Sequence, residues 1–146
     1  MKKKLFREVQ LGKLTLKNAV VMAPMTRSRA LGNLANDLIA LYYSQRASAG
    51  LIITEGVSPS PNGLGYARIP GLFNKAQSDS WKPVTDSVHQ RGARIFLQLM
   101  HTGRVSHPAN MPKGSKILAP SPVALTGQIW TDTEGMQNHP VPAEMS

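Results

Sequence analysis

The sequence predicts an α/β fold built on a parallel β-sheet. Three short apolar runs, at residues 19–23, 51–54 and 93–99, alternate with two segments in which apolar residues follow helical spacing. The joints between each helix and the next strand are short, as in right-handed βαβ units with parallel strands. The 146 residues allow one domain with a real core.

The first main strand is predicted at residues 19–23, a continuous apolar run that suits a strand buried on both faces. Residues 8–11 and 14–16 alternate around a Gly-Lys pair and predict a small hairpin that covers the core ahead of it. Pro24 ends the strand because proline cannot donate to a sheet ladder. Three residues then lie in a loop at the carboxyl end of the strand, where parallel α/β folds bind ligands: Met25, Thr26 and Arg27.

The first helix is predicted from Asn36, a good N-cap, to about residue 48. Gly50 provides the C-terminal stop. The second strand follows at once at residues 51–54 and ends at Glu55 and Gly56.

The second helix is predicted to open at residues 78–79. We expect its regular part to begin at about Lys82, because Pro83 is tolerated only in a first turn. The third strand, residues 93–99, comes directly after it.

The segment after Val105 is predicted to be a long excursion that carries a small hairpin. Six of the eleven prolines fall in it, too many for a regular sheet interior or helix. Residues 141–146 read as the approach to a further helix with Ser146 as its N-cap. A sheet that stops there leaves an apolar strand edge unpaired.

Composition excludes several classes of function. The net charge is +9, but apart from the basic start the Lys and Arg residues are scattered singly, so we expect a solvated surface and no nucleic-acid binding. The absence of cysteine removes disulfides, thiolate metal sites and a cysteine nucleophile, and we expect no metal site. No apolar run approaches a membrane span, and no signal core follows the basic start, so we expect a soluble cytoplasmic protein.

The carboxyl ends of the three strands should meet at one rim of the sheet. This rim offers a hydroxyl at Thr26, a backbone without Cβ at Gly56 and a carboxamide at Gln98. A planar heterocycle with imide-like edges, such as a flavin, needs such a set of groups. Taken alone, the same set can line any polar pocket.

Several motifs along the chain together resemble the Old Yellow Enzyme family. They are Ala-Pro-Met-Thr-Arg at 23–27, Asn-Asp at 36–37 before Tyr-Tyr at 42–43, residues 45–56, Tyr66, Pro-Gly-Leu at 70–72, Gln-Leu-Met-His-Thr-Gly-Arg at 98–104 and residues 118–122. The resemblance implies an FMN-dependent (β/α)8 barrel that consumes NAD(P)H. Residues 1–146 would be its N-terminal part, with the first three strands of the eight, an N-terminal hairpin and a long capping loop, incomplete without the remaining strands.

The resemblance also implies roles for individual residues. Thr26 would bond the isoalloxazine and adjust its reduction potential, Gly56 would meet the flavin by its backbone and Gln98 would bind the pyrimidine edge. Tyr66 and Met100 would line the substrate side. The remaining flavin neighbours would be Ala23, Pro24 and Met25.

Plainer interpretations stand beside these roles. Thr26 can cap its loop, Gly56 can serve a turn, and Gln98 can be an ordinary polar strand end. Tyr66 can pack under its loop, and Met100 can simply fill a gap.

The function implied by the resemblance is reduction of an activated C=C bond in a small alkene such as an enone, maleimide or nitroalkene. A complementary chain, or self-association, would supply the missing strands. The alternative is a non-catalytic fragment or interaction module that pairs through its open strand edge.

Overall fold

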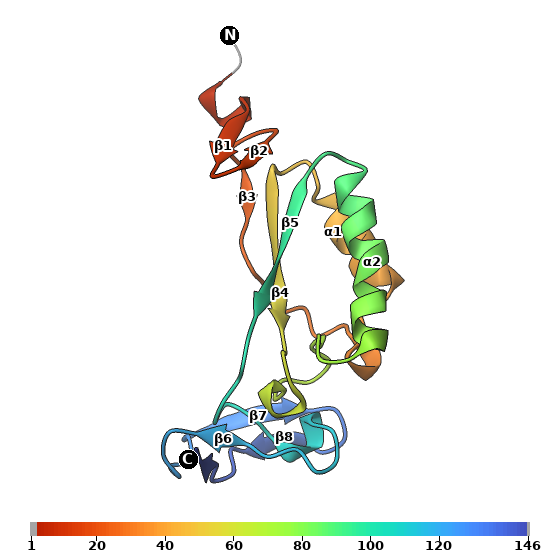
Figure 1. Ribbon diagram of the computed structural model, residues 1–146. Helices are drawn as coiled ribbons and strands as arrows, with labels where there is room; N and C mark the ends of the chain where they lie inside the picture. Colours follow the sequence, from red (N-terminus) through yellow and green to blue (C-terminus); the bar gives the residue numbers. More distant parts are fainter. Residues whose placement is uncertain (1–2, 146) are drawn as a thin grey trace.

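The protein is described by a computed structural model that covers residues 3–145. Its centre is a parallel sheet of three strands in chain order: β3 (Val21–Met22), β4 (Leu51–Val57) and β5 (Arg94–Leu99). Two helices lie together on one face of this sheet, α1 (Asp37–Gln45) and α2 (Lys75–His89) (Figure 1). The predicted α/β class and the order of the strands and helices are therefore confirmed.

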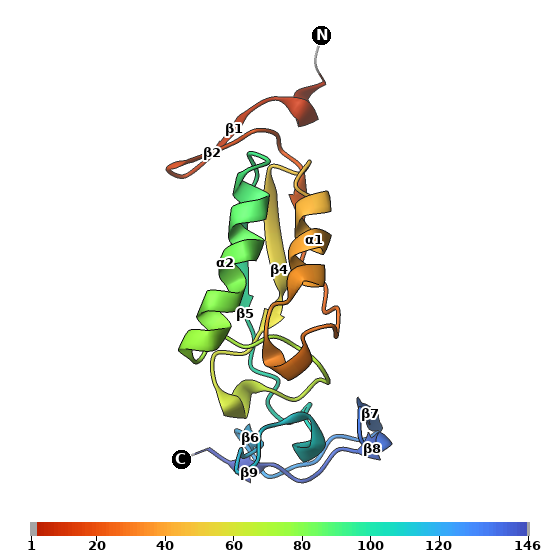
Figure 2. The same ribbon diagram turned by 90° about the vertical axis from the view of Figure 1, so that its right-hand side faces the viewer.

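Smaller elements lie at the two ends of the sheet. At the amino end is the predicted antiparallel hairpin of β1 (Val9–Leu11) and β2 (Leu14–Leu16), but β1 is exposed throughout and only Leu16 of β2 is buried, so the hairpin covers little of the core. At the carboxyl end lie four short strands: β6 (Leu118–Ala119), β7 (Gln128–Thr131), β8 (Gly135–Asn138) and β9 (Ala143–Glu144) (Figure 2). Short 3₁₀ turns occur at Lys4–Phe6, Leu31–Asn33, Pro61–Gly63 and Pro108–Asn110.

The hydrophobic core lies between the sheet and the two helices. Tyr43 of α1 and Val84 of α2 are fully buried there against Ile52 of β4. On the opposite face no helix of residues 3–145 covers the sheet, and Val21 and Phe96 are 48% and 43% exposed. Apolar residues on both faces are typical of a parallel sheet that is covered on both sides.

Two strand predictions need correction. The strand predicted at residues 19–23 is only Val21–Met22, and it is not buried on both faces. It is an edge strand whose second face has no cover, so the ladder to β4 holds just two residue pairs. The strand predicted at residues 51–54 continues to Val57, because β5 pairs with it as far as Val57 and a bulge carries that pairing past Glu55.

Two helix predictions also differ from the structure. The first helix has the predicted Asn36 cap, whose side chain accepts a hydrogen bond from the Ile39 amide, but it ends at Gln45 rather than near residue 48. The second helix begins at Lys75, seven residues before the predicted regular start, because Asn74 caps it. Pro83 lies inside this helix, on its exposed side.

The long excursion contains the predicted small hairpin, formed by β7 and β8. It also contains a parallel pair, β6 with β9, that the sequence did not indicate. Residues 143–144 form that second strand, so the approach to a helix predicted at residues 141–146 is replaced there by extended chain. The predicted N-cap, Ser146, lies outside the described residues.

Candidate functional site

The three groups predicted to share one rim come together at the carboxyl end of the sheet. Gly56 and Gln98 are direct partners in the pairing of β4 with β5. The amide of Arg27 donates to Glu55 Oε2 at 3.1 Å, which holds Thr26, the preceding residue, beside the end of β4. The convergence inferred from strand order is therefore present in the structure.

A β-bulge in β4 shapes this end of the sheet. Ile53 pairs with Phe96 and Gly56 with Gln98, so β4 contains one residue more than β5 over the same stretch. The Thr54 hydroxyl serves both sides of the irregularity: it donates to the Glu55 carbonyl at 2.8 Å and accepts the Gln98 amide at 3.1 Å. Bulges re-aim side chains and are frequent beside active sites.

The side chains of Thr26 and Gln98 are free to bind a ligand. Within residues 3–145 neither the Thr26 hydroxyl nor the Gln98 carboxamide makes a hydrogen bond to the protein, although the Gln98 backbone amide does. Gln98 is half-buried, and Ala23, Pro24, Met25 and Thr26 are all exposed. One hydroxyl and one unpaired carboxamide beside an apolar loop fit the polar edge of a flavin.

Gly56 was expected to offer an open backbone to the flavin, but the space beside it contains a side chain of the protein. A Cβ at Gly56 would lie 2.5 Å from Sδ, 2.6 Å from Cε and 2.9 Å from Cβ of Met100. The space left open by the missing side chain is therefore filled by Met100, and this Gly is required for packing between neighbouring strands. Contact of its backbone with a flavin stays a prediction.

Glu55 is a buried carboxyl group at the rim that the sequence did not single out. Its side chain is 0% exposed, Oε2 accepts the Arg27 amide, and Oε1 has no hydrogen-bond partner. Burial raises the pKa of the Glu55 carboxyl, against the opposing effects of the Arg27 amide and charge. The Glu55 amide donates to the Tyr43 hydroxyl at 2.7 Å, and burial raises the pKa of Tyr43. The sequence signal that could have identified Glu55 is an acidic residue placed directly between a buried apolar run and a glycine.

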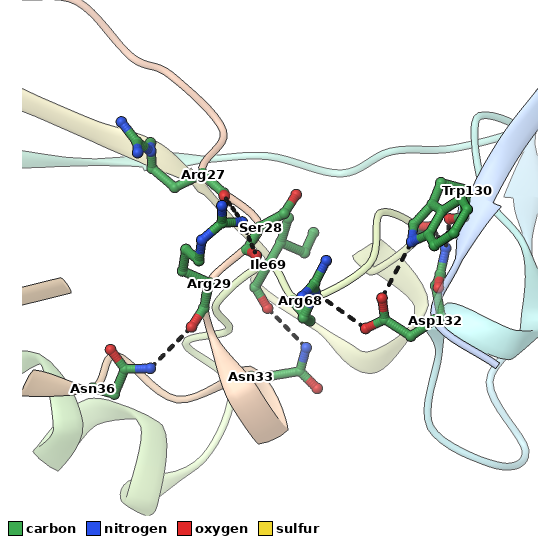
Figure 3. Close-up of polar contacts among 11 residues, drawn as sticks. Arg27, Ser28, Arg29, Asn33, Asn36, Arg68, Ile69, Trp130 and Asp132 are labelled. Atoms are coloured by element: carbon green, nitrogen blue, oxygen red, sulfur yellow. Dashed lines mark hydrogen bonds and ion pairs between the residues drawn. The ribbon is translucent and has the colours of Figure 1, made fainter. Parts of the chain in front are cut away.

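The β7–β8 hairpin closes the other side of the rim. Tyr66 and Thr26 line a cavity of about 320 Å³ together with Ile129 and Trp130 of β7. Figure 3 shows the attachment: Asp132 pairs with Arg68 at 3.2 Å and accepts from Trp130 Nε1 at 3.2 Å. Trp130 was not singled out from the sequence, because nothing local links it to the strand ends.

Asn110 fastens the same hairpin a second time. Its Nδ2 donates to the carbonyls of Gly65 and Trp130, both at 2.8 Å. The loop that carries Tyr66 and the strand that carries Trp130 are thus tied together. Arg104 binds the carbonyl of Val123 at 2.9 Å and the Ser121 hydroxyl at 2.9 Å, which leaves it a structural role in this excursion.

The loop after β3 is ordered by its own contacts. Arg29 Nη1 donates to the carbonyls of Arg27 and Ser28 at 3.1 and 3.0 Å, and Asn36 Nδ2 donates to the Arg29 carbonyl at 2.9 Å (Figure 3). The Arg27 side chain points away from the hairpin in that view and stacks on the Tyr42 ring, with Cζ 4.1 Å from the ring centroid.

A wide groove runs along the exposed edge of β3. Its volume is about 910 Å³, and it is lined by residues of the β3 segment, of α1 and of the turn after α1, among them Met22, Met25 and Arg46. The groove lies at a sheet edge with unpaired backbone, which is where a further strand can add.

Two other features are absent from residues 3–145. No group of three or more His, Asp or Glu side chains is arranged to hold a metal ion. None of the helices in this part of the chain combines the length and apolarity needed to cross a bilayer.

Comparison with known proteins gave consistent matches. A family model described as the NADH:flavin oxidoreductase / NADH oxidase family matches residues 4–146. Rice 12-oxophytodienoate reductase 7 (Oryza sativa subsp. japonica) is 37% identical over 145 residues, which make up 97% of this chain and 37% of the relative. Rice 12-oxophytodienoate reductase 1 is 43% identical over 129 residues, 87% of this chain and 33% of the relative.

Solved structures agree with these matches. A structure of morphinone reductase superimposes with a TM-score of 0.90 at 43% identity and covers 97% of this chain and 39% of the other. The Old Yellow Enzyme homologue from Zymomonas mobilis gives a TM-score of 0.91 at 38% identity, with 99% and 40% coverage. The chain therefore spans about 40% of the length of these proteins.

Proposed function

This chain belongs to the NADH:flavin oxidoreductase / NADH oxidase family, and on that premise we propose that it forms the N-terminal part of an FMN-dependent ene reductase. The whole enzyme takes hydride from NAD(P)H and reduces the activated C=C bond of an enone, maleimide or nitroalkene. The observation that carries the proposal is the rim: Gly56 opposite Gln98, with the Thr26 loop bonded to Glu55 beside them.

Each group at the rim has a distinct part in the proposal. Bound FMN supplies hydride transfer, accepting from a nicotinamide and delivering to the alkene. The Thr26 hydroxyl donates a hydrogen bond to the flavin ring, and the Gln98 carboxamide donates and accepts along its pyrimidine edge. Tyr66 and Met100 line the substrate side, and Trp130 joins them because it shares a cavity with Tyr66 and Thr26.

Further β/α units complete the barrel in this proposal, on the same polypeptide or on a complementary chain. Three observations support it. The apolar residues Val21 and Phe96 are exposed on the face of the sheet that the helices leave bare. The groove of about 910 Å³ follows the edge of β3. The matched solved structures are more than twice as long as this chain.

The experiment is reconstitution with FMN. The protein, with the strands that complete its barrel present, should copurify as a yellow flavoprotein, lose its colour on anaerobic addition of NAD(P)H and regain it when an enone is added. Thr26→Ala should change the midpoint potential of the bound flavin, while Thr85→Ala, an exposed-helix control whose hydroxyl donates to the Lys82 carbonyl, should not. A colourless preparation with all strands present would contradict the enzyme proposal.

The alternative function is a non-catalytic module that associates through the edge of β3. The same groove and bare face favour it. It predicts stable association, with itself or a partner, that neither requires nor retains FMN. The size and the flavin absorbance of the purified protein, measured with and without added FMN, distinguish the two proposals. The ene reductase should carry FMN in its assembled species, whereas the non-catalytic module should assemble without it.

A further inference from the structure

We propose that Glu55 is a positioning residue that fixes the orientation of Thr26 toward the flavin, through the main chain of Arg27. This inference rests on the proposed function, in which Thr26 bonds the ring. Glu55 is buried and has no role in the proposed hydride transfer itself.

The geometry starts at the β4 bulge. The irregularity between Ile53 and Gly56 leaves Glu55 buried, where its Oε2 accepts the Arg27 amide at 3.1 Å. This amide belongs to the rigid peptide unit formed by the Thr26 carbonyl and the Arg27 nitrogen. Holding that unit restricts the ψ angle of Thr26, and with it the direction of the Thr26 Cα–Cβ bond.

Besides the stacking of the Arg27 side chain on Tyr42 of α1, few contacts hold the loop at this point. Residues 24–27 have no regular secondary structure, and Pro24, Met25 and Thr26 are exposed. Within residues 3–145, the bond to Glu55 is the one hydrogen bond that joins residues 24–27 to another strand or helix. The hydrogen bonds of Arg29 to the carbonyls of Arg27 and Ser28 stay inside the loop.

The Arg27 amide needs only an acceptor oxygen at Glu55, because burial raises the pKa of this carboxyl and so favours its neutral form. Oε1 is buried without a partner, and a cavity of about 190 Å³ beside the carboxyl is lined by Arg27, Arg29 and Tyr42. The neutral carboxyl, the carboxylate and the carboxamide of Gln each offer an oxygen that can accept this amide, whereas an apolar side chain offers none. Breaking only this contact should release Thr26 while the sheet stays intact.

The first test needs no flavin. Hydrogen exchange of the Arg27 amide is compared in the wild-type full-length protein and in Glu55→Met, which lacks an acceptor. Protection of Arg27 should fall roughly 10- to 100-fold, whereas the Gln98 amide, bonded to Thr54, should keep its protection. Glu55→Gln, which retains an acceptor oxygen, should keep most of the wild-type protection of the Arg27 amide. Unchanged Arg27 protection in Glu55→Met would overturn the proposal.

A second variant covers the case in which Glu55→Met does not fold. Glu55→Asp keeps the carboxyl group but shortens the side chain by one methylene, so Arg27 protection should again fall relative to Gln98. Equal protection of Arg27 in Glu55→Asp and wild type would count against the contact.

The second test is a double-mutant cycle on the midpoint potential of the bound flavin. Glu55→Met should shift the potential in the same direction as Thr26→Ala, and the double variant should match Thr26→Ala alone. Fully additive shifts would show that Glu55 does not act through Thr26 and would overturn the proposal. If Thr26→Ala leaves the potential unchanged, the proposed role of Thr26 fails instead, and loss of Arg27 protection still reports on the Glu55 contact separately.

Discussion

Replacing Gly56 by Ala is the sharpest test of how β4 and β5 pack at the rim. The new Cβ would lie 2.5 Å from Sδ and 2.9 Å from Cβ of Met100, whereas carbon atoms in contact are about 3.5 to 4.0 Å apart. Met100 must therefore move by about 1 Å or more, and the Met100 Cβ, fixed to the backbone, cannot simply rotate away.

The size of the effect follows from two opposing contributions. Overpacking in a well-packed site lowers the free energy of unfolding by about 1 to 3 kcal/mol. The backbone at Gly56 does not have a positive φ, so Ala fits it without strain and restricts the unfolded chain, which returns about 0.4 to 1 kcal/mol. We expect Gly56→Ala to destabilise the protein by roughly 1 to 2 kcal/mol.

Urea denaturation of the wild type, Gly56→Ala, Met100→Ala and the double variant measures this coupling. Removing the Met100 sulfur and methyl takes away the two shortest contacts, so the double variant should be more stable than the sum of the single effects predicts, by about 1 kcal/mol. Gly12→Ala is the control, because a Cβ there meets nothing within 4 Å and its cost arises from φ +58° alone. Additivity of Gly56→Ala with Met100→Ala to within about 0.5 kcal/mol would refute the packing argument.

Three further predictions concern capping, pH and the hairpin. Asn74→Ala removes the acceptor of the Gln77 amide and should lower the free energy of unfolding by about 1 kcal/mol in urea; no change would contradict its capping role. Burial raises the pKa of Glu55, so the contribution of this carboxyl to stability is fully present below the ordinary Glu pKa and is lost as the pH rises through the raised value. Glu55→Gln lacks that loss, so its stability relative to wild type should increase as the pH rises above the ordinary Glu pKa, and a constant difference would contradict this. Asp132→Ala breaks the ion pair with Arg68, in which the Arg68 side chain is 37% exposed and that of Asp132 42% exposed. The substitution should lower the free energy of unfolding by less than about 1 kcal/mol and should speed hydrogen exchange in β7 and β8. Unchanged exchange in these strands would show that the ion pair does not anchor the hairpin.

The order of the elements was predictable because its signals are local. The Asn36 cap, the apolar runs and the short joints each act within a few residues, and together they gave a parallel βαβ arrangement. The start of α2 differs from the prediction because the prediction rested on Pro83 and did not include Asn74, which caps the helix. In the folded chain Pro83 lies on the exposed side of the helix, where solvent can satisfy the freed carbonyl.

The sequence by itself determined the strand order, and with it the meeting of Thr26, Gly56 and Gln98 at one end of the sheet, because parallel strands expose their carboxyl ends together. Only the tertiary structure decided the contacts among residues far apart in the chain. The Arg27 amide donates a hydrogen bond to Glu55, 28 residues later in the chain. Met100 fills the space beside Gly56, and the β7–β8 hairpin places Trp130 in the same cavity as Tyr66. Such contacts depend on a bulge and on the path of a long loop, which no local pattern of residues specifies.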